Sequence, residues 1–192
     1  NQRTAQRSDP AIPLNLWDGC AALGVERPAD GLVFAVDVSP EQASASIGVC
    51  WRRSDGVPHL ELIENAPGVG WVPGRVSELR ERWGGVWLLD PRGASGSQQA
   101  DWPGMLLKAA DARRSCAELE AAVRAGQVGH YGQRELRVAL EGAVRKPSED
   151  GGWSWARRST VVDISPLVAV SLALGGVLSG VQQMSDPLGS FW

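Results

Sequence analysis

The sequence predicts an α/β domain, in which a mixed sheet (an antiparallel meander plus parallel strands) is flanked by helices. Three successive segments with strand patterns near the N-terminus indicate the meander. A helical segment then leads to a fourth, apolar strand, and such a crossover favours a parallel placement beside the first strand. Segments with helical spacing fill most of the remaining chain, which predicts helices on the faces of this sheet.

Four segments have the pattern of strands: residues 31–38, 45–52, 59–65 and 86–89. The first is almost continuously apolar, which is typical of a central strand buried on both faces. The second and third alternate apolar with polar side chains, and the turn Ser54-Asp55-Gly56 separates them. We therefore expect an antiparallel meander, with the fourth strand parallel to the first.

Helical spacing of apolar residues predicts five helices: residues 73–83, 97–109, 115–125, 133–144 and a last one that begins near Pro166 with Ser165 as N-cap. Trp153-Ser154-Trp155 alternates like a hairpin strand. The stretch 164–181 is apolar, but it lacks basic flanks and contains several serines and glycines, so we interpret it as a buried core helix rather than a membrane span.

The composition fits one folded domain. The chain has 192 residues, of which 43% are hydrophobic. We expect residues 1–30, with several prolines, to form an arm or linker, residues 31–181 the domain, and residues 182–192 a tail. The net charge of −3 excludes a strong overall attraction for nucleic acid, so DNA binding would need a local basic patch. The three cysteines have no motif spacing and predict reduced, partly buried thiols.

Three aspartates follow or precede apolar segments. Asp37 ends the run 32–36, Asp90 ends the run 86–89, and Asp163 directly precedes the last helix. A carboxylate beside buried apolar surface is costly unless it is paired or binds a cation. If strand 86–89 lies beside strand 31–38, Asp37 and Asp90 project from one edge of the sheet, about 4.8 Å apart. Asp163 can then close the site from the mouth of the helix.

Carboxylates and water suit Mg²⁺ or Mn²⁺. Two such ions about 4 Å apart can activate a water and stabilise a phosphodiester transition state. Each aspartate also has a structural interpretation: Asp90-Pro91-Arg92-Gly93 is a good type I turn, Asp37 suits an Asx turn, and Asp163 suits a helix N-terminus. The order of the elements around the three aspartates favours the joint, metal-binding interpretation.

That order is the ribonuclease H-like arrangement, and the local sequence resembles the C-terminal nuclease domain of phage large terminase subunits. The resemblance covers residues 13–176 and rests on five segments: residues 33–40, 87–90, 129–133, 153–158 and 162–169. It implies an endonuclease that cuts concatemeric viral DNA during packaging in the cytoplasm of an infected bacterium. The family's metal-binding carboxylates correspond to Asp37, Asp90 and Asp163.

The resemblance also implies partners. The family's full-length protein carries an ATPase motor, whereas this chain has no GxxxxGK[ST] loop, since Gly93-Ala94-Ser95-Gly96-Ser97 lacks the lysine. We therefore expect the nuclease half alone, with residues 1–30 as the joint to the motor. Double-stranded DNA, the terminase ATPase domain, the small terminase and the portal are the implied partners, and no membrane is.

Basic residues near the third aspartate are candidates for DNA binding: Arg157, Arg158, Arg145 and Lys146. A solvated turn is the alternative for these four. His130 has no His or Cys partner at metal spacing, so we interpret it as structural, with a role near the phosphate as the alternative. Asp111 is either an auxiliary acid or a solvated surface residue.

The sequence is also compatible with functions other than a packaging nuclease. Another ribonuclease H-like nuclease, of the resolvase or transposase type, would have the same carboxylates. A non-catalytic domain that docks on the portal or motor would have no need to keep three mutually repelling carboxylates together. A sugar-kinase or actin-like ATPase also starts with a strand, an aspartate and a meander, but 192 residues are too few for its two domains.

Overall fold

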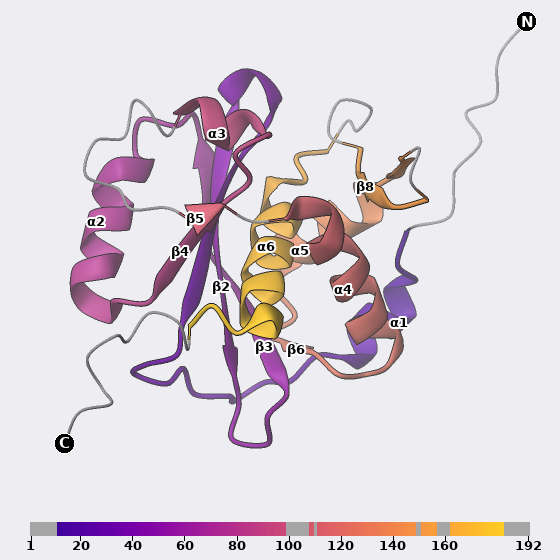
Figure 1. The fold of residues 1–192 in the computed structure, drawn as a ribbon. Coiled ribbons are helices and arrows are strands. Elements are labelled where there is room, and N and C mark those ends of the chain that lie inside the picture. The colour runs from indigo at the N-terminus through magenta and orange to yellow at the C-terminus, as the bar shows by residue number, and fades with distance from the viewer. Residues whose placement is uncertain (1–10, 99–107, 110, 149–150, 157–161, 183–192) are drawn as a thin grey trace, which may run out of the picture.

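A computed structural model describes residues 11–98, 108–109, 111–148, 151–156 and 162–182. Their centre is a six-stranded sheet in the order β5-β4-β1-β2-β3-β6 (Figure 1). Its strands are β1 (Val33–Val38), β2 (Ser44–Arg52), β3 (Pro58–Pro67), β4 (Val86–Leu89), β5 (Lys108–Ala109) and β6 (Gly129–His130). A separate hairpin consists of β7 (Arg145–Pro147) and β8 (Trp153–Trp155).

The pairing of the strands confirms the predicted topology. β1 and β2 are antiparallel, and so are β2 and β3, which makes the expected meander. β4 lies parallel to β1 on the other side, and β5 and β6 extend the sheet at its two edges in parallel with their neighbours. β1 is therefore central, and all six of its residues are buried, as its apolar run predicts.

Helices cover both faces of the sheet (Figure 1). They are α1 (Leu14–Gly19), α2 (Val72–Trp83), α3 (Ala94–Gln98), α4 (Ala112–Arg124), α5 (Arg134–Gly142) and α6 (Ser165–Ser179), with a short 3₁₀ turn η1 (Pro40–Gln42). Figure 1 shows α2 on one face and α6, α4 and α5 on the other. Alternate residues of β1 accordingly belong to two cores, Phe34 and Val36 to the core with α2, Val33 and Ala35 to the core with α6.

The α6 helix is the centre of the larger core. Its residues from Ser165 to Val177 are buried. It approaches the sheet closely at Gly48 of β2, where an added Cβ would lie 2.8 Å from the backbone nitrogen of Val170. The absence of a side chain at Gly48 thus sets how near the helix can lie to the strands. No helix of the described part of the chain has the length and apolar character needed to cross a membrane.

Several elements differ from the predictions. Residues 14–19, expected to be irregular, form α1, whose Trp17 is buried. The helix expected over 97–109 is wrong in the described residues, because α3 ends at Gln98 and Lys108–Ala109 is strand β5. β6 has no predicted counterpart. Ser165 is the first residue of α6, and its N-cap is Ile164. Short strands and helices have too few residues for a periodic pattern to show.

Candidate metal and nucleic-acid site

Asp37 and Asp90 occupy equivalent positions on neighbouring parallel strands. The register of β1 and β4 pairs Ala35 with Leu88. Asp37 lies two residues beyond Ala35, and Asp90 two residues beyond Leu88, so both carboxylates follow the same pleat to the same face. Ala35 and Leu88 belong to the core with α6, which places both aspartates on the α6 face. The expected pair at one edge of the sheet is therefore present.

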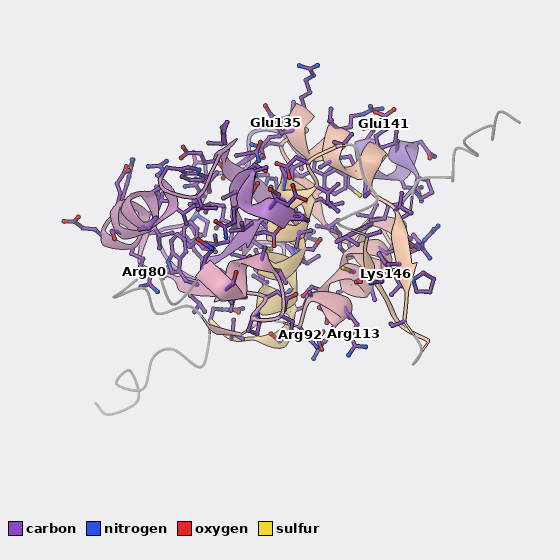
Figure 2. All side chains as sticks on the ribbon, turned by 90° about the horizontal axis from the view of Figure 1, so that it is seen from above. Arg80, Arg92, Arg113, Glu135, Glu141 and Lys146 are labelled. Atoms are coloured by element: carbon purple, nitrogen blue, oxygen red, sulfur yellow. The ribbon has the colours of Figure 1, made fainter. Side chains whose placement is uncertain are left out.

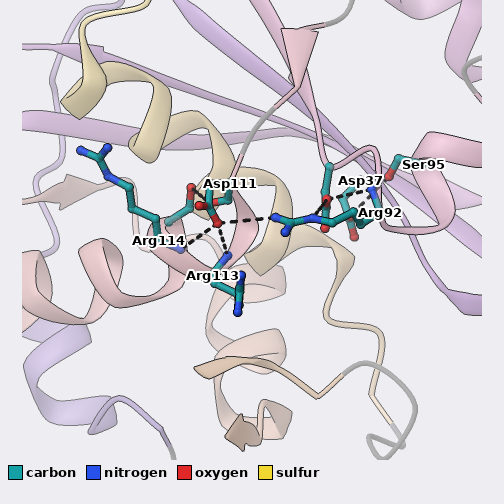
Figure 3. A network of polar contacts seen from close by, with 8 residues as sticks. Asp37, Arg92, Ser95, Asp111, Arg113 and Arg114 are labelled. Carbon is teal, nitrogen blue, oxygen red and sulfur yellow. Dashed lines mark hydrogen bonds and ion pairs between the residues drawn. The ribbon is translucent and has the colours of Figure 1, made fainter. Parts of the chain in front are cut away.

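Asp37 is fully buried, and Asp90 is 8% exposed. The hydroxyl of Ser95, in α3, lies 3.4 Å from Oδ1 of Asp37, and the same hydroxyl accepts a 3.1 Å hydrogen bond from the backbone N–H of Val38. Figure 3 shows Ser95 reaching toward Asp37 from its helix. Ser95 thus fixes the end of β1 and contacts the buried carboxylate.

Asp90 begins a tight turn. Its backbone carbonyl accepts from Gly93 N–H at 3.1 Å, and its Oδ1 accepts from Arg92 N–H at 3.0 Å. The predicted turn is confirmed, and its side-chain hydrogen bond uses Oδ1 of Asp90. The following α3 folds back so closely that any side chain at Gly96 would overlap the carbonyl of Pro91. This close approach brings Ser95 to Asp37.

Asp163 lies over β2 and β3 and is fixed by four hydrogen bonds. Its Oδ1 accepts from the backbone N–H of Ser165 at 2.9 Å. Its Oδ2 accepts from the hydroxyl of Ser44 at 2.6 Å, from the amide of Asn65 at 3.0 Å and from the hydroxyl of Ser165 at 3.0 Å. Burial raises the pKa of Asp163, but these hydrogen bonds outweigh it, so the pKa lies below its usual value of 3.8.

The three aspartates do not form one compact cluster in the described residues, where no three His, Cys, Asp or Glu side chains stand close enough together to hold a metal ion. Asp37 and Asp90 form a pair across β1 and β4, while Asp163 is held by residues of β2, β3 and α6. All three still face α6, because Asp37 lies opposite Ser46 in the β1–β2 register and Ser46 contacts Ser165 at 2.8 Å.

A cleft of about 880 Å³ opens beside Asp90. Its walls come from the η1 turn, the loop after β4, the start of α4 and the β7–β8 hairpin. The charged residues that line it are Glu41, Asp90, Arg92, Arg113 and Lys146. Figure 2 shows Arg92, Arg113 and Lys146 on one side of the molecule, with Glu135 and Glu141 on the opposite side. Three cations and two carboxylates thus line the cleft, in a chain whose net charge is −3.

Solved structures share the fold of this chain. The HK97 bacteriophage large terminase has a TM-score of 0.72 at 15% identity, over 88% of this chain and 43% of that one. The large terminase nuclease of thermophilic phage G20c with bound magnesium has a TM-score of 0.56 at 14% identity, over 84% and 95% of the two chains. This chain has the fold of a large terminase nuclease domain.

A third similar structure is a mutant nuclease domain of the large terminase subunit of bacterial virus Sf6, with manganese and β-thujaplicinol (TM-score 0.58, 12% identity, 85% of this chain and 97% of that one). This chain spans less than half of the HK97 large terminase but nearly all of the isolated nuclease domains. No protein-family model matches the sequence, and no curated protein does. At these identities the likeness shows the terminase nuclease fold.

Of the four predicted DNA-binding residues, the structure describes two, Arg145 and Lys146. Lys146 lines the cleft. The Arg145 guanidinium contacts the Glu120 carboxylate and the carbonyl of Ala11 and lies 4.8 Å from the ring centroid of Trp153, so it joins the hairpin to the rest of the molecule. Arg157 and Arg158 lie outside the described residues.

Two further residues have structural roles in the described part of the terminase nuclease fold. The His130 ring stacks on Trp17 with centroids 4.0 Å apart, and its Nδ1 accepts from Gly132 N–H at 2.9 Å. Its Nε2 therefore carries the proton and donates to the Trp17 carbonyl at 2.8 Å. Burial lowers the pKa of His130, which agrees with a neutral ring. The structural interpretation of His130 is confirmed.

Asp111 is the N-cap of α4 and accepts from the backbone N–H groups of Arg113 and Arg114 at 3.1 and 3.2 Å. It also lies 3.6 Å from the guanidinium of Arg92, whose other side is 3.6 Å from Asp90 (Figure 3). Arg92 thus joins the turn after β4 to the start of α4. Sequence reasoning missed Ser95, Asn65 and Arg113, because no local motif marks a residue that reaches the site from a distant segment. It assigned Arg92 only to the turn after Asp90.

Proposed function

We propose that the chain is a divalent-metal-dependent DNA endonuclease that cuts concatemeric viral DNA during genome packaging by two-metal phosphodiester hydrolysis. The observation that carries this proposal is the in-register pair Asp37 and Asp90 at the carboxyl ends of two parallel strands, beside a cleft lined by Arg92, Arg113 and Lys146. Asp163 is the third carboxylate of the proposed site. The magnesium and manganese of similar solved terminase nucleases support a divalent metal ion in a domain of this fold.

The donor set fits Mg²⁺ or Mn²⁺. Asp37 is fully buried in a strand of apolar residues, and a carboxylate there needs a compensating charge. Mg²⁺ is commonly bound by one or two carboxylates, with waters and substrate phosphates as its other ligands. Asp37 and Asp90 supply that minimum, so the lack of a compact group of three ligands among the described residues is compatible with a hard divalent ion.

The residues of the proposed site have different roles in metal binding and DNA binding. Asp37 and Asp90 would hold the ions, which supply water activation and charge stabilisation when bound. Ser95 would restrain Asp37 through its 3.4 Å contact. Arg92, Arg113 and Lys146 would bind phosphates of the DNA backbone along the cleft, which needs no sequence recognition. Arg157 and Arg158 remain proposed phosphate contacts.

The test is nicking of supercoiled plasmid by the purified chain in Mg²⁺, in Mn²⁺ and in EDTA. We expect cutting with either metal and none in EDTA. Asp37→Asn should abolish cutting, whereas Asp18→Asn, which changes an exposed aspartate that pairs with Arg137 and does not line the cleft, should not. Equal cutting by the wild-type chain and Asp37→Asn, or cutting in EDTA, would exclude the proposed site.

A non-catalytic docking domain is the second candidate, and the separation of Asp163 from the other two aspartates favours it. Such a domain would cut no plasmid with either metal.

A ribonuclease H-like resolvase or transposase would instead cut branched or end-specific DNA, so a four-way junction and a linear duplex are useful parallel substrates. The small terminase, the portal and an ATPase motor domain are the proposed partners in the infected bacterial cytoplasm.

A further inference from the structure

Five polar side chains form a continuous network between β2, β3 and the start of α6. Its members are Ser44, Ser46, Asn65, Asp163 and Ser165. Ser44 and Ser46 lie on β2, Asn65 lies opposite Ser46 on β3, and the other two lie at the mouth of α6. The network connects three segments of the chain.

The hydrogens of the network have one consistent direction. The Asn65 amide has two hydrogens, and its two shortest contacts are Oγ of Ser46 at 2.9 Å and Oδ2 of Asp163 at 3.0 Å. Ser46 thus accepts from Asn65 and donates to Ser165 at 2.8 Å. Ser165 in turn donates to Asp163. Every hydrogen therefore points, directly or through a serine, at one carboxylate.

This direction assigns Asp163 as an acceptor only. A neutral amide at position 163 would have to donate, and the hydroxyl of Ser44 and the amide of Asn65 already direct hydrogens at the same place. The geometry therefore requires the ionised carboxylate and holds it in one orientation. Asn65 is the residue that reaches it from the exposed end of β3, without belonging to the core.

We propose that Asn65 is a positioning residue of the nuclease site, which, together with Ser44, orients the Asp163 carboxylate for the metal. The inference rests on the proposed nuclease function. Asn65 touches neither of the other two aspartates in the described contacts, and it acts through Asp163. Groups that hydrogen-bond a metal-binding carboxylate usually change metal affinity by roughly 10- to 100-fold when they are removed.

The experiment measures Mn²⁺ binding to the purified chain by isothermal titration calorimetry, in the absence of DNA. Asn65→Leu and Ser44→Ala should each raise the Kd for Mn²⁺ by about tenfold. Asn65→Gln, which retains the amide donor, should restore part of the affinity. Urea unfolding of each variant in EDTA checks that the fold persists.

A matched control is Gln133→Ala. The Gln133 side chain also makes two hydrogen bonds to β3, with the N–H and the carbonyl of Leu62 at 2.7 and 2.8 Å, but it has no contact with Asp163 among the described interactions. This variant should bind Mn²⁺ with wild-type affinity even if it is less stable. The control distinguishes two explanations for weaker Mn²⁺ binding: a general weakening of β3 and the loss of the orientation of Asp163.

The outcomes distinguish the inference from the proposed function. No Mn²⁺ binding by the wild-type chain overturns both. Binding that is lost in Asp37→Asn but unchanged in Asn65→Leu and Ser44→Ala supports the nuclease site and overturns the positioning role. A tenfold loss in Asn65→Leu that Gln133→Ala reproduces also overturns the positioning role, because general loosening of β3 would explain both.

Discussion

At the residue scale, Asp37 and Asp90 are acidic side chains at positions where apolar side chains would make the fold more stable. Both lie on a face that is otherwise a hydrophobic core, and Asp37 has no exposed surface. Two carboxylates at equivalent positions on adjacent strands repel each other. Sequences that fold well usually avoid such conflicts, and exceptions are expected at functional sites.

The first prediction concerns this pair. Asp37→Asn or Asp90→Asn should reduce plasmid nicking by at least about 100-fold, because a metal ion supplies several kcal/mol of transition-state stabilisation. In EDTA, each variant should be as stable as the wild type or slightly more stable, because the repulsion is relieved. Nicking rates and urea unfolding curves measure both effects. Wild-type nicking by both variants would show that these aspartates are structural.

The second prediction concerns Asp163, which should behave in the opposite way. Asp163→Asn should destabilise the fold at pH 7 by about 1–3 kcal/mol, because the donors of Ser44 and Asn65 would lose their acceptor. Since the pKa of Asp163 is depressed in the folded chain, its stabilisation is present above its usual value of 3.8 and is lost as pH falls through the folded value.

The difference in unfolding free energy between wild type and Asp163→Asn should therefore be larger at pH 7 than at a pH below 3.8. Urea unfolding at the two pH values measures it, with Asp18→Asn as the comparison for an exposed aspartate whose pKa is also lowered, by its hydrogen bond with Arg137. A variant as stable as the wild type at pH 7 would contradict the acceptor-only role of Asp163.

At the scale of elements, the site depends on how closely α6 lies to the sheet. The start of this helix carries Ser165 and follows Asp163, and Gly48 of β2 permits the approach. The helix itself is amply encoded by its apolar residues. Its distance from the strands depends instead on residues without a side chain, among them Gly48 of β2 and Gly176 of α6.

The third prediction uses this contact. Gly48→Ala should destabilise the fold by about 1–3 kcal/mol, because the added Cβ would lie 2.8 Å from the backbone of Val170, which cannot move independently of α6. Gly74→Ala is the matched control: nothing lies within 4 Å of an added Cβ there, and Gly74 is in α2, so alanine should be neutral or stabilising by up to about 1 kcal/mol. Thermal unfolding compares the two, and equal stabilities would contradict the packing argument.

At the scale of the whole molecule, basic and acidic side chains are found on different sides. The chain carries a net charge of −3, yet Arg92, Arg113 and Lys146 line one cleft and Glu135 and Glu141 lie on the opposite side (Figure 2). Weak overall attraction with a local basic surface should orient DNA on the molecule rather than bind it tightly. An ATPase motor that delivers DNA at high local concentration would compensate for the weak binding.

The fourth prediction follows from this division. DNA binding by the isolated chain should be weak, steeply dependent on salt and nearly independent of sequence. Arg113→Ala combined with Lys146→Ala should weaken it and reduce the slope of log K against log salt by up to about two. Fluorescence anisotropy across a salt series measures the slope. Arg82→Ala with Arg124→Ala is the control of equal charge change, because neither residue lines the cleft.

The fifth prediction concerns energy supply. The sequence contains no GxxxxGK[ST] loop that could bind the phosphates of ATP. The purified protein should therefore neither bind nor hydrolyse ATP. Plasmid nicking should proceed at the same slow rate with and without ATP, because hydrolysis of a phosphodiester is downhill. A strict requirement for ATP, or ATP turnover, would overturn the proposed function.

The sequence by itself determined the meander, the parallel fourth strand and the edge at which Asp37 and Asp90 meet. These follow from local signals: apolar runs, alternation and the helical crossover that favours parallel pairing. The turn at Asp90 and the buried α6 were predictable for the same reason, because a few adjacent residues encode them.

Only the tertiary structure decided which distant residues reach these aspartates. Ser95 meets Asp37 because Gly96 packs on Pro91, and Asn65 meets Asp163 because the β2–β3 register brings it opposite Ser46. The cleft likewise combines cations from the loop after β4, the start of α4 and the β7–β8 hairpin. Such contacts depend on packing between segments far apart in the chain, and packing leaves no periodic signal in a single sequence.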